Sequence, residues 1–226
     1  MSLKIGLIGC SNTALKNFIP LMAVSDFTKL GFIASRSSTK AQDWARKFHC
    51  ESFGSYDEII ESNVDLIYMP LPIGLHEKWI IKAAKSGKHI LCEKSSTTSY
   101  KSAKKITKVC KENDVRILEA FSYRFHPQHE HVQNLIKNEI GTLQNFVGNF
   151  GFAPPPKDNI RWNKKLGGGV LNDAACYPIC ASRIMLKKEP ISVTAKLMLD
   201  KEYEVDTKAD IFLKFSDEKT AFISSG

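Results

Sequence analysis

A turn of small residues near the amino terminus is suited to holding phosphate. The apolar run Lys4–Ile8 leads into Gly9-Cys10-Ser11-Asn12-Thr13-Ala14 and then into a helical pattern. Where a strand turns tightly into a helix, free backbone N–H groups and the positive end of the helix dipole can hold a pyrophosphate. Gly9 and Ala14 match the G-x-G-x-x-G/A pattern of dinucleotide-binding turns, and Ser11 replaces the middle glycine. The turn therefore predicts a dinucleotide site, and a merely tight structural turn is the alternative.

The residues after the second apolar run indicate which dinucleotide is bound. Enzymes that select NAD place an acid there, which accepts a hydrogen bond from the ribose 2′-hydroxyl. This chain instead has Ser35 and Arg36 followed by two more serines, with Lys40 about one helical turn further on. A guanidinium flanked by hydroxyls suits a 2′-phosphate. We therefore predict NADP(H) in preference to NAD(H), the alternative being an exposed arginine with no ligand.

Other polar side chains stand where a substrate could meet them. Pro70–His76 and Glu93-Lys94 each directly follow an apolar, strand-like run. Ligands of doubly wound sheets bind at the carboxyl ends of the strands, so both segments are placed for chemistry. Asp173 and Tyr177 are four residues apart on a predicted helix, and they therefore share one face.

Strand-like and helical patterns alternate through the first half of the chain. The expected strands are Lys4–Ile8, Leu30–Ala34, Val64–Met69, His89–Cys92 and Val115–Ala120, and the expected helices between them are Ala14–Val24, Thr39–Phe48, Tyr56–Ser62, Leu75–Ser86 and Ser99–Asn113. Such alternation implies right-handed crossovers and a parallel sheet covered by helices on both faces. We predict a doubly wound α/β domain over residues 1–121.

The pattern changes after residue 121. Helices are expected at Pro127–Lys137 and Leu171–Leu186, and strands at Leu143–Phe152, Ser192–Leu199, Glu204–Phe215 and Thr220–Ser224. Three consecutive prolines make residues 153–157 an irregular loop, because proline cannot continue a strand ladder. Consecutive hairpin-linked strands imply a largely antiparallel sheet with a helix on one face. We predict a second, α+β domain over residues 122–226.

Composition and charge exclude several classes of protein. The 226 residues are 43% hydrophobic and 25% charged, which is typical of a globular protein, and the net charge is +8. The lysines of residues 101–111 recur at helical spacing with no aromatic residues between them, which indicates a solvated helix face rather than a nucleic-acid site. No run is long enough to span a bilayer, and no secretory signal is present. The six cysteines form no C-x-x-C pair, and His126, His129 and His131 lack further ligands, so we expect a cytoplasmic protein without a metal site.

Taken together, these segments resemble the glucose-fructose oxidoreductase, inositol dehydrogenase and MocA-type (Gfo/Idh/MocA) oxidoreductases over essentially the whole chain. The resemblance rests on the order and spacing of several short segments, namely Gly9–Ala14, His76, Glu93-Lys94, Glu119–Pro127, Glu139–Gly141, Asn159–Arg161 and Gly167–Gly169. Inositol dehydrogenases of this family typically carry histidine where Tyr177 stands. A tyrosine there is similar to the branch with dihydrodiol and xylose dehydrogenases and nucleotide ketosugar reductases. The implied fold is an N-terminal Rossmann domain, doubly wound and parallel, followed by the α+β domain.

The resemblance also implies an activity and a site. Hydride would pass between NADP(H) and a hydroxyl or ketone of a sugar, nucleotide sugar or polyol, and Tyr177 would exchange the proton. A free phenol titrates near pH ~10, so Lys94 would supply the cation that it needs, with Asp173 keeping Lys94 charged and oriented. The residues expected to contact the cofactor are Gly9, Ser11, Asn12, Thr13, Ser35, Arg36, Lys40, Leu71, Pro72, His76, Glu93, Lys94 and Arg161. The alternatives are a surface lysine at position 94, a core-edge phenol at position 177 and an exposed loop at Arg161.

The chain departs from the family pattern in sequence and in length. Ser11 and Ala175 stand where the family has glycine, and Ser95 stands where proline usually follows Glu-Lys. The chain also ends at Gly226, before further strands that the resemblance implies for the second sheet, so that sheet is expected to be incomplete. A fragment, a shortened natural variant and a chain completed by a partner subunit all explain this length.

Two classes of function stay open from the sequence. An enzyme with a small-molecule substrate, forming a homo-oligomer through the C-terminal sheet, is favoured because Lys94, Asp173 and Tyr177 are all retained. A non-catalytic NADP-binding regulatory protein or a remnant of the family is the alternative, and the short chain and the departures at Ser11, Ser95 and Ala175 favour it. Nucleic acid and membrane are not expected as partners.

Overall fold

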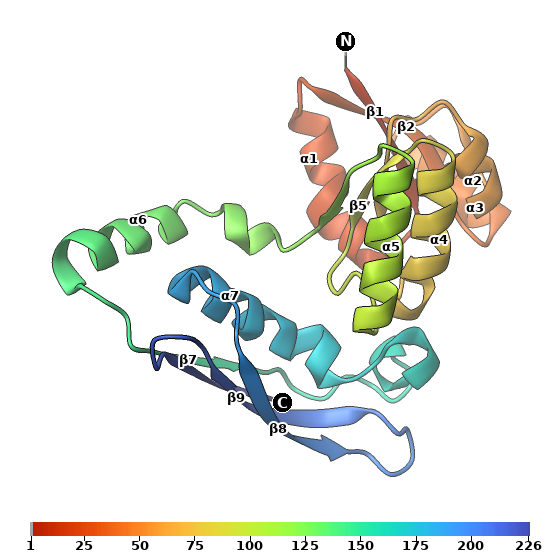
Figure 1. Ribbon diagram of the computed structural model, residues 1–226. Coiled ribbons are helices and arrows are strands. Elements are labelled where there is room, and N and C mark those ends of the chain that lie inside the picture. The colour runs from red at the N-terminus through yellow and green to blue at the C-terminus, as the bar shows by residue number, and fades with distance from the viewer. Residues whose placement is uncertain (1) are drawn as a thin grey trace. The chain divides into compact units, whose positions relative to one another are not determined.

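The computed structural model describes residues 2–226, and its internal contacts divide the chain after Ala120 into an N-terminal and a C-terminal unit (Figure 1). Within these described residues, the first unit holds a six-stranded parallel sheet with helices and the second holds a four-stranded sheet. The predicted fold class, a doubly wound parallel sheet followed by an α+β unit, is confirmed. No helix in residues 2–226 combines the length and the apolar character needed to cross a bilayer.

The N-terminal sheet has the strand order β3-β2-β1-β4-β5-β6. Its strands are β1 (Leu3–Ile8), β2 (Thr28–Ala34), β3 (Phe53–Gly54), β4 (Leu66–Met69), β5 (His89–Cys92) and β6 (Ile117–Glu119). Its helices are α1 (Ile19–Val24), α2 (Ser38–Lys47), α3 (Tyr56–Glu61), α4 (Ile73–Lys85) and α5 (Tyr100–Glu112). The strand order reverses direction at β1, which has β2 on one side and β4 on the other. The carboxyl end of β1 is therefore the switch point where this fold binds ligands.

Both faces of this sheet are buried. On β1, Ile8 packs with Ile67 in one core cluster, whereas the adjacent Leu7 packs with Tyr68 in another. The ring of Tyr68 stacks on Phe18 with 4.0 Å between the ring centroids. A strand that is buried on both faces becomes a continuous apolar run, which is why the sequence pattern identified these strands.

Two local features of this unit differ from the predicted elements. The helix expected over Ala14–Val24 begins as a π-helix, Ala14–Phe18, and becomes α1 only at Ile19. Pro20 has no N–H to donate, and the N–H of Ile19 reaches back to Ala14 O instead of continuing the α pattern. Strand β3 was not predicted because its two residues are too short to produce a periodic pattern.

The C-terminal sheet has the strand order β7-β10-β9-β8. Its strands are β7 (Asn145–Phe150), β8 (Ser192–Leu199), β9 (Asp206–Lys214) and β10 (Thr220–Ser225). The pairs β10–β9 and β9–β8 are antiparallel, as expected from hairpin-linked strands, whereas β10 and β7 are parallel. The parallel pair arises because the chain leaves β7 through a long loop and a helix rather than through a hairpin.

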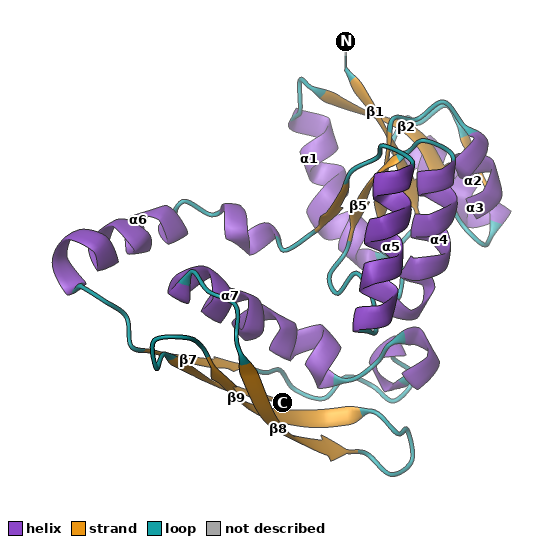
Figure 2. Cartoon of the chain, in the orientation of Figure 1, coloured by secondary structure: helices purple, strands orange, loops and turns teal. Residues whose placement is uncertain are grey.

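One face of the C-terminal sheet is covered by helix. The helix predicted over Leu171–Leu186 is a π-helix, Leu171–Ala175, continued by α7 (Cys176–Leu186), and α7 lies along the sheet (Figure 2). Ala175 and Leu186 pack there against Ile211 and Phe215. Helix α6 (Gln128–Leu135) precedes β7. Large apolar side chains of the strands, among them Val147 and Phe222, are exposed.

Candidate active site

The turn after β1, which the sequence predicts to cradle phosphate, is tight and depends on a glycine. Gly9 has a φ of 108°, and a Cβ built on it would lie 2.7 Å from Leu71 Cδ2. Its N–H donates to Ala34 O at 2.9 Å, which joins the carboxyl ends of β1 and β2. Ser11 Oγ accepts from the N–H of Ala14 at 3.1 Å, so the serine that replaces glycine in the pattern satisfies a backbone donor at the start of the helix.

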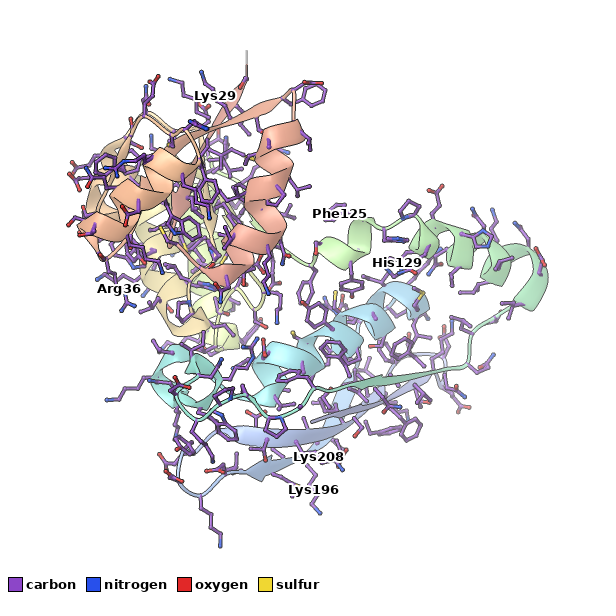
Figure 3. The ribbon with its side chains drawn as sticks, turned by 180° about the vertical axis from the view of Figure 1, so that it is seen from behind. Lys29, Arg36, Phe125, His129, Lys196 and Lys208 are labelled. Carbon is purple, nitrogen blue, oxygen red and sulfur yellow. The ribbon has the colours of Figure 1, made fainter. Side chains whose placement is uncertain are left out.

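The residues after β2 lie beside this turn. Ser35 is buried, its N–H donates to Gly54 O at 2.9 Å, and its Oγ accepts from the N–H of Ser37. Burial raises the pKa of Cys10 to about 11, while the charge of Lys40 and a hydrogen bond with Ser35 act in the opposite direction. Cys10 Sγ also lies 4.0 Å from Ala34 O, which places this turn beside the end of β2. Arg36 is exposed at the surface of the N-terminal unit (Figure 3).

Ser37 completes this group by starting α2. Its Oγ accepts from the N–H of Lys40 at 3.2 Å, which caps the helix. The cap fixes the backbone on which Arg36 and Lys40 are presented. The structure thus brings the predicted residues of the β1 turn and of the β2 end to one edge of the sheet.

His76 lies beneath the loops that follow β4 and β5. It is fully buried, with Nε2 2.8 Å from Leu71 O and Nδ1 3.0 Å from Ser95 O. Burial lowers its pKa, although hydrogen bonds with the backbone of Leu71, Ser95 and Ser96 and the charge of Glu119 act to raise it. His76 therefore ties the two predicted cofactor-contact segments together from inside the protein.

Hydrogen bonds from other parts of the N-terminal unit also hold the Glu93-Lys94-Ser95 segment in place. The peptide bond between Lys94 and Ser95 is cis. The N–H of Ser96 donates to Glu119 Oε1 at 2.6 Å. Tyr68 Oη donates to Glu93 Oε1 at 2.7 Å, and burial together with the Glu93 charge raises the pKa of Tyr68. Tyr68 was missed by the sequence analysis because it lies within an apolar strand pattern.

In the C-terminal unit, Asp173 forms an ion pair with Arg161. Arg161 Nε donates to Asp173 Oδ2 at 2.5 Å, and the Asp173 side chain is the less exposed partner. The sequence analysis expected Arg161 to contact the cofactor and Asp173 to serve Lys94. The structure shows that Arg161, from the same unit, is an ion-pair partner of Asp173.

Tyr177 lies among aromatic rings. The ring centroids of Phe121, Tyr123 and Phe150 are 5.6, 5.7 and 5.2 Å from its own. Tyr123 Oη donates to the backbone oxygen of Tyr177 at 3.4 Å. These contacts fix the orientation of the phenol, and Asp173 stands one helical turn before it.

The loop before this helix depends on glycine. Gly169 has a φ of 112°, and a side chain there would collide with Asp206. Asp206 Oδ2 in turn accepts from the N–H of Leu171 at 2.5 Å, which anchors the start of the helical segment. Among the residues that the structure describes, no cluster of three or more histidine, cysteine or acidic side chains could hold a metal ion.

Comparison with known families agrees with this architecture. Residues 3–121 match an oxidoreductase family with an NAD-binding Rossmann fold, and residues 129–226 match the C-terminal domain of the same Gfo/Idh/MocA group. The chain belongs to the Gfo/Idh/MocA oxidoreductase family. The family and the enzyme class predicted from the sequence, an NAD(P)-dependent oxidoreductase, are confirmed.

Several Gfo/Idh/MocA members are similar to most of this chain. A dTDP-3,4-didehydro-2,6-dideoxy-α-D-glucose 3-reductase from Actinomadura kijaniata is 31% identical over 99% of this chain and 68% of its own length. A D-xylose 1-dehydrogenase (NADP(+)) from Haloferax volcanii is 33% identical over 97% of the chain and 68% of its own length. A trans-1,2-dihydrobenzene-1,2-diol dehydrogenase from Xenopus tropicalis is 30% identical over 85% of the chain and 59% of its own length.

Solved Gfo/Idh/MocA structures share the fold. The 3-ketoreductase from Actinomadura kijaniata, in complex with NADP and TDP-benzene, superposes with a TM-score of 0.93 at 30% identity, covering 100% of this chain and 70% of its own. An aldose-aldose oxidoreductase from Caulobacter crescentus reaches a TM-score of 0.93 at 24% identity, covering 100% of this chain and 71% of its own, and it shows the fold alone.

Proposed function

We propose that this protein transfers hydride between NADP(H) and a hydroxyl or ketone of a sugar or nucleotide sugar, with NADP(H) preferred over NAD(H). The observation that carries the proposal is the helical segment on which Asp173, paired with Arg161, stands one turn before an aromatic-packed Tyr177. A carboxylate and an oriented phenol on one helix face suit proton transfer. The similar reductase and xylose dehydrogenase act on such substrates by their names.

The residues at the edge of the N-terminal sheet fit a phosphorylated dinucleotide. Gly9 has a positive φ and carries no side chain, so its backbone can approach a pyrophosphate closely. Arg36 and Lys40 offer two cations beside the ends of β1 and β2, where an NAD-selective site would place an acid. Gly9, Ser11, Asn12 and Thr13 would hold the pyrophosphate, and Ser35, Arg36 and Lys40 would hold the 2′-phosphate. Leu71, Pro72, Glu93 and Lys94 would line the remainder of the site, with His76 as their internal support.

The bound cofactor supplies or accepts the hydride, and the protein manages the proton. Tyr177 holds the proton at Oη and exchanges it with the substrate oxygen. Because a free phenol has a pKa near ~10, a cation must favour its ionised form, and we assign that task to Lys94. Asp173 would keep the charged side chain of Lys94 oriented, and Arg161 fixes the position of the Asp173 carboxylate.

Relatives of this chain support these assignments. Solved forms of the similar 3-ketoreductase include one with a tyrosine changed to phenylalanine and others with a lysine changed to alanine or glutamate. A tyrosine and a lysine are the residue types that we assign to proton transfer here.

The test is a substrate screen on the full chain. NADPH and NADH oxidation is followed with dTDP-ketosugars, and NADP⁺ reduction with D-xylose and related aldoses. The proposal predicts turnover of at least one of these classes, faster with the phosphorylated cofactor. Tight NADPH binding without any turnover would instead support a regulatory protein, and absence of binding to either nucleotide would refute the cofactor assignment.

We also propose that the C-terminal sheet mediates self-association. Val147, Met198 and Phe222 share one face of the sheet and are each more than half exposed, which is unusual for a group of large apolar side chains. Light scattering of the purified chain should give a mass above the 25.4 kDa of one copy. A monomeric mass at high concentration would contradict this.

A further inference from the structure

The start of α3 carries a tyrosine, Tyr56, next to the residues that follow β2. Ser55 and Glu58 form a capping box, in which the N–H of Ser55 donates to Glu58 Oε2 at 2.6 Å and the N–H of Glu58 donates to Ser55 Oγ at 3.3 Å. Tyr56 is the first residue of the helix that this box begins. Because Gly54 pairs with Ala34 of β2, Tyr56 is placed beside the residues that follow β2.

The ring of Tyr56 is anchored and its hydroxyl reaches the cofactor turn. The ring packs edge-on against the buried Trp79, with 5.1 Å between centroids and an interplanar angle of 88°. Tyr56 Oη would lie only 3.6 Å from a Cβ built on Gly9. The hydroxyl is therefore held at the edge of the sheet, between the phosphate turn and the end of β2.

Arg36 follows Ser35, whose N–H donates to Gly54 O at 2.9 Å, so Arg36 and Tyr56 stand on adjoining backbone segments. Burial raises the pKa of Tyr56, and the charge of Arg36 and a hydrogen bond with its side chain act to lower it. A neutral phenol oxygen can accept from a guanidinium, which has five N–H donors. One donor given to Tyr56 leaves four for a ligand. The contact also restricts an otherwise flexible, exposed side chain.

We propose that Tyr56 is a positioning residue for cofactor selection, which holds the Arg36 guanidinium where a 2′-phosphate binds. The inference rests on the proposed preference for NADP(H). Tyr56 acts through Arg36 and belongs to no proton-transfer step. Its fixed ring converts Arg36 from a mobile surface cation into a preorganised one, and preorganisation raises affinity for the phosphate without a new contact.

The test compares ligands with and without the 2′-phosphate on the full chain. Calorimetric titrations with NADPH, NADH, 2′,5′-ADP and 5′-AMP are made on wild type, Tyr56→Phe, Arg36→Ala and the double variant. Tyr56→Phe keeps the ring packed on Trp79 and removes the hydroxyl. It should weaken the binding of NADPH and 2′,5′-ADP about fivefold, whereas the affinities for NADH and 5′-AMP should change by less than about twofold. The double variant should bind NADPH no more weakly than Arg36→Ala. Tyr203→Phe, which removes a phenol from the C-terminal unit, is the matched control and should change nothing.

The outcomes separate this inference from the proposed function. If Arg36→Ala weakens NADPH binding and Tyr56→Phe does not, the inference is wrong and the NADP(H) preference stands. If Tyr56→Phe weakens NADH and NADPH equally, Tyr56 supports the whole turn and the inference is again wrong. If wild type binds NADPH no better than NADH, the proposed preference itself fails, and the inference fails with it. Unchanged NADH affinity in each variant shows that the site is still folded.

Discussion

Arg161 donates from Nε to Oδ2 of Asp173 at 2.5 Å, across twelve residues of loop and triple-glycine turn. The Arg161 side chain is 43% exposed and that of Asp173 18%, so solvent screens the pair and its contribution to folding is small. The value of the contact lies in orientation, because it fixes a carboxylate one helical turn before the phenol of Tyr177. The guanidinium also lies over the ring of Phe152, with 5.5 Å to the centroid, which restricts it further.

Arg161→Ala should therefore lower activity more than stability. We expect kcat/KM to fall about tenfold because Asp173 loses its fixed position, while the free energy of unfolding changes by less than about 1 kcal/mol. Steady-state kinetics and urea unfolding measure the two effects. Arg183→Ala is the control, since Arg183 on α7 is 46% exposed and forms an ion pair with the more exposed Glu189. An equal loss of activity in both variants would show that Arg161 has no special role.

His76 should make stability depend on pH. Its folded-state pKa lies below the 6.5 of an unperturbed histidine, mainly because it is buried, so below pH 6.5 the unfolded chain binds a proton that the folded chain resists. The stabilisation is complete above that pH and is lost as the pH falls through the window beneath it. His76→Gln should cost about 1–3 kcal/mol at pH 7.5, because the amide cannot reproduce the fit of the ring between two buried carbonyls, and should flatten the pH dependence.

Urea unfolding at pH 7.5 and 5.5 tests this expectation. The wild type should lose more free energy of unfolding between these two pH values than His76→Gln does. His49→Gln, the same substitution at an exposed histidine, is the matched control. If His76→Gln and the wild type lose equal free energy of unfolding between the two pH values, His76 does not titrate as described.

Gly9→Ala should damage both folding and cofactor binding. The φ of 108° is unfavourable for a side chain, and the new Cβ would approach Leu71 Cδ2 at 2.7 Å. We expect a loss of about 1–3 kcal/mol in the free energy of unfolding and weaker binding of both NADPH and NADH. Gly87→Ala is matched to it, since Gly87 also has a positive φ but nothing within 4 Å of a Cβ. That variant should lose stability alone, and a loss of nucleotide affinity there would undermine the cradle assignment.

The sequence was sufficient to predict the N-terminal unit because its strands are buried on both faces. Such strands appear as uninterrupted apolar runs, and the helices between them carry a clear amphipathic period. For the same reason the sequence did not reveal Tyr68 as a site residue. It lies within an apolar strand, and its hydroxyl donates a hydrogen bond to Glu93. The partnership of Arg161 with Asp173 depends on how a loop without periodicity folds, so spacing alone did not predict it. The parallel pairing of β7 with β10 likewise depends on a long connection rather than on a local pattern.

The structure explains two of the departures from the family pattern, those at Ser11 and Ala175. Ser11 satisfies the N–H of Ala14, which explains how a serine serves in place of glycine. Ala175 is fully buried against the C-terminal sheet, where its methyl group contributes to the core. Neither departure removes a group that we assign to proton transfer.

The most direct test of the proposed function is the rate of a single variant, Tyr177→Phe, with NADPH affinity measured beside it. The substitution keeps the ring among Phe121, Tyr123 and Phe150 and removes only the hydroxyl. We predict that kcat falls by about 10²–10⁴ on whichever sugar substrate the wild type turns over, while the Kd for NADPH stays within about twofold. Tyr123→Phe, its aromatic neighbour, should keep most of the activity. A Tyr177→Phe variant with near wild-type kcat would contradict the assignment of Tyr177 as the proton-transfer residue.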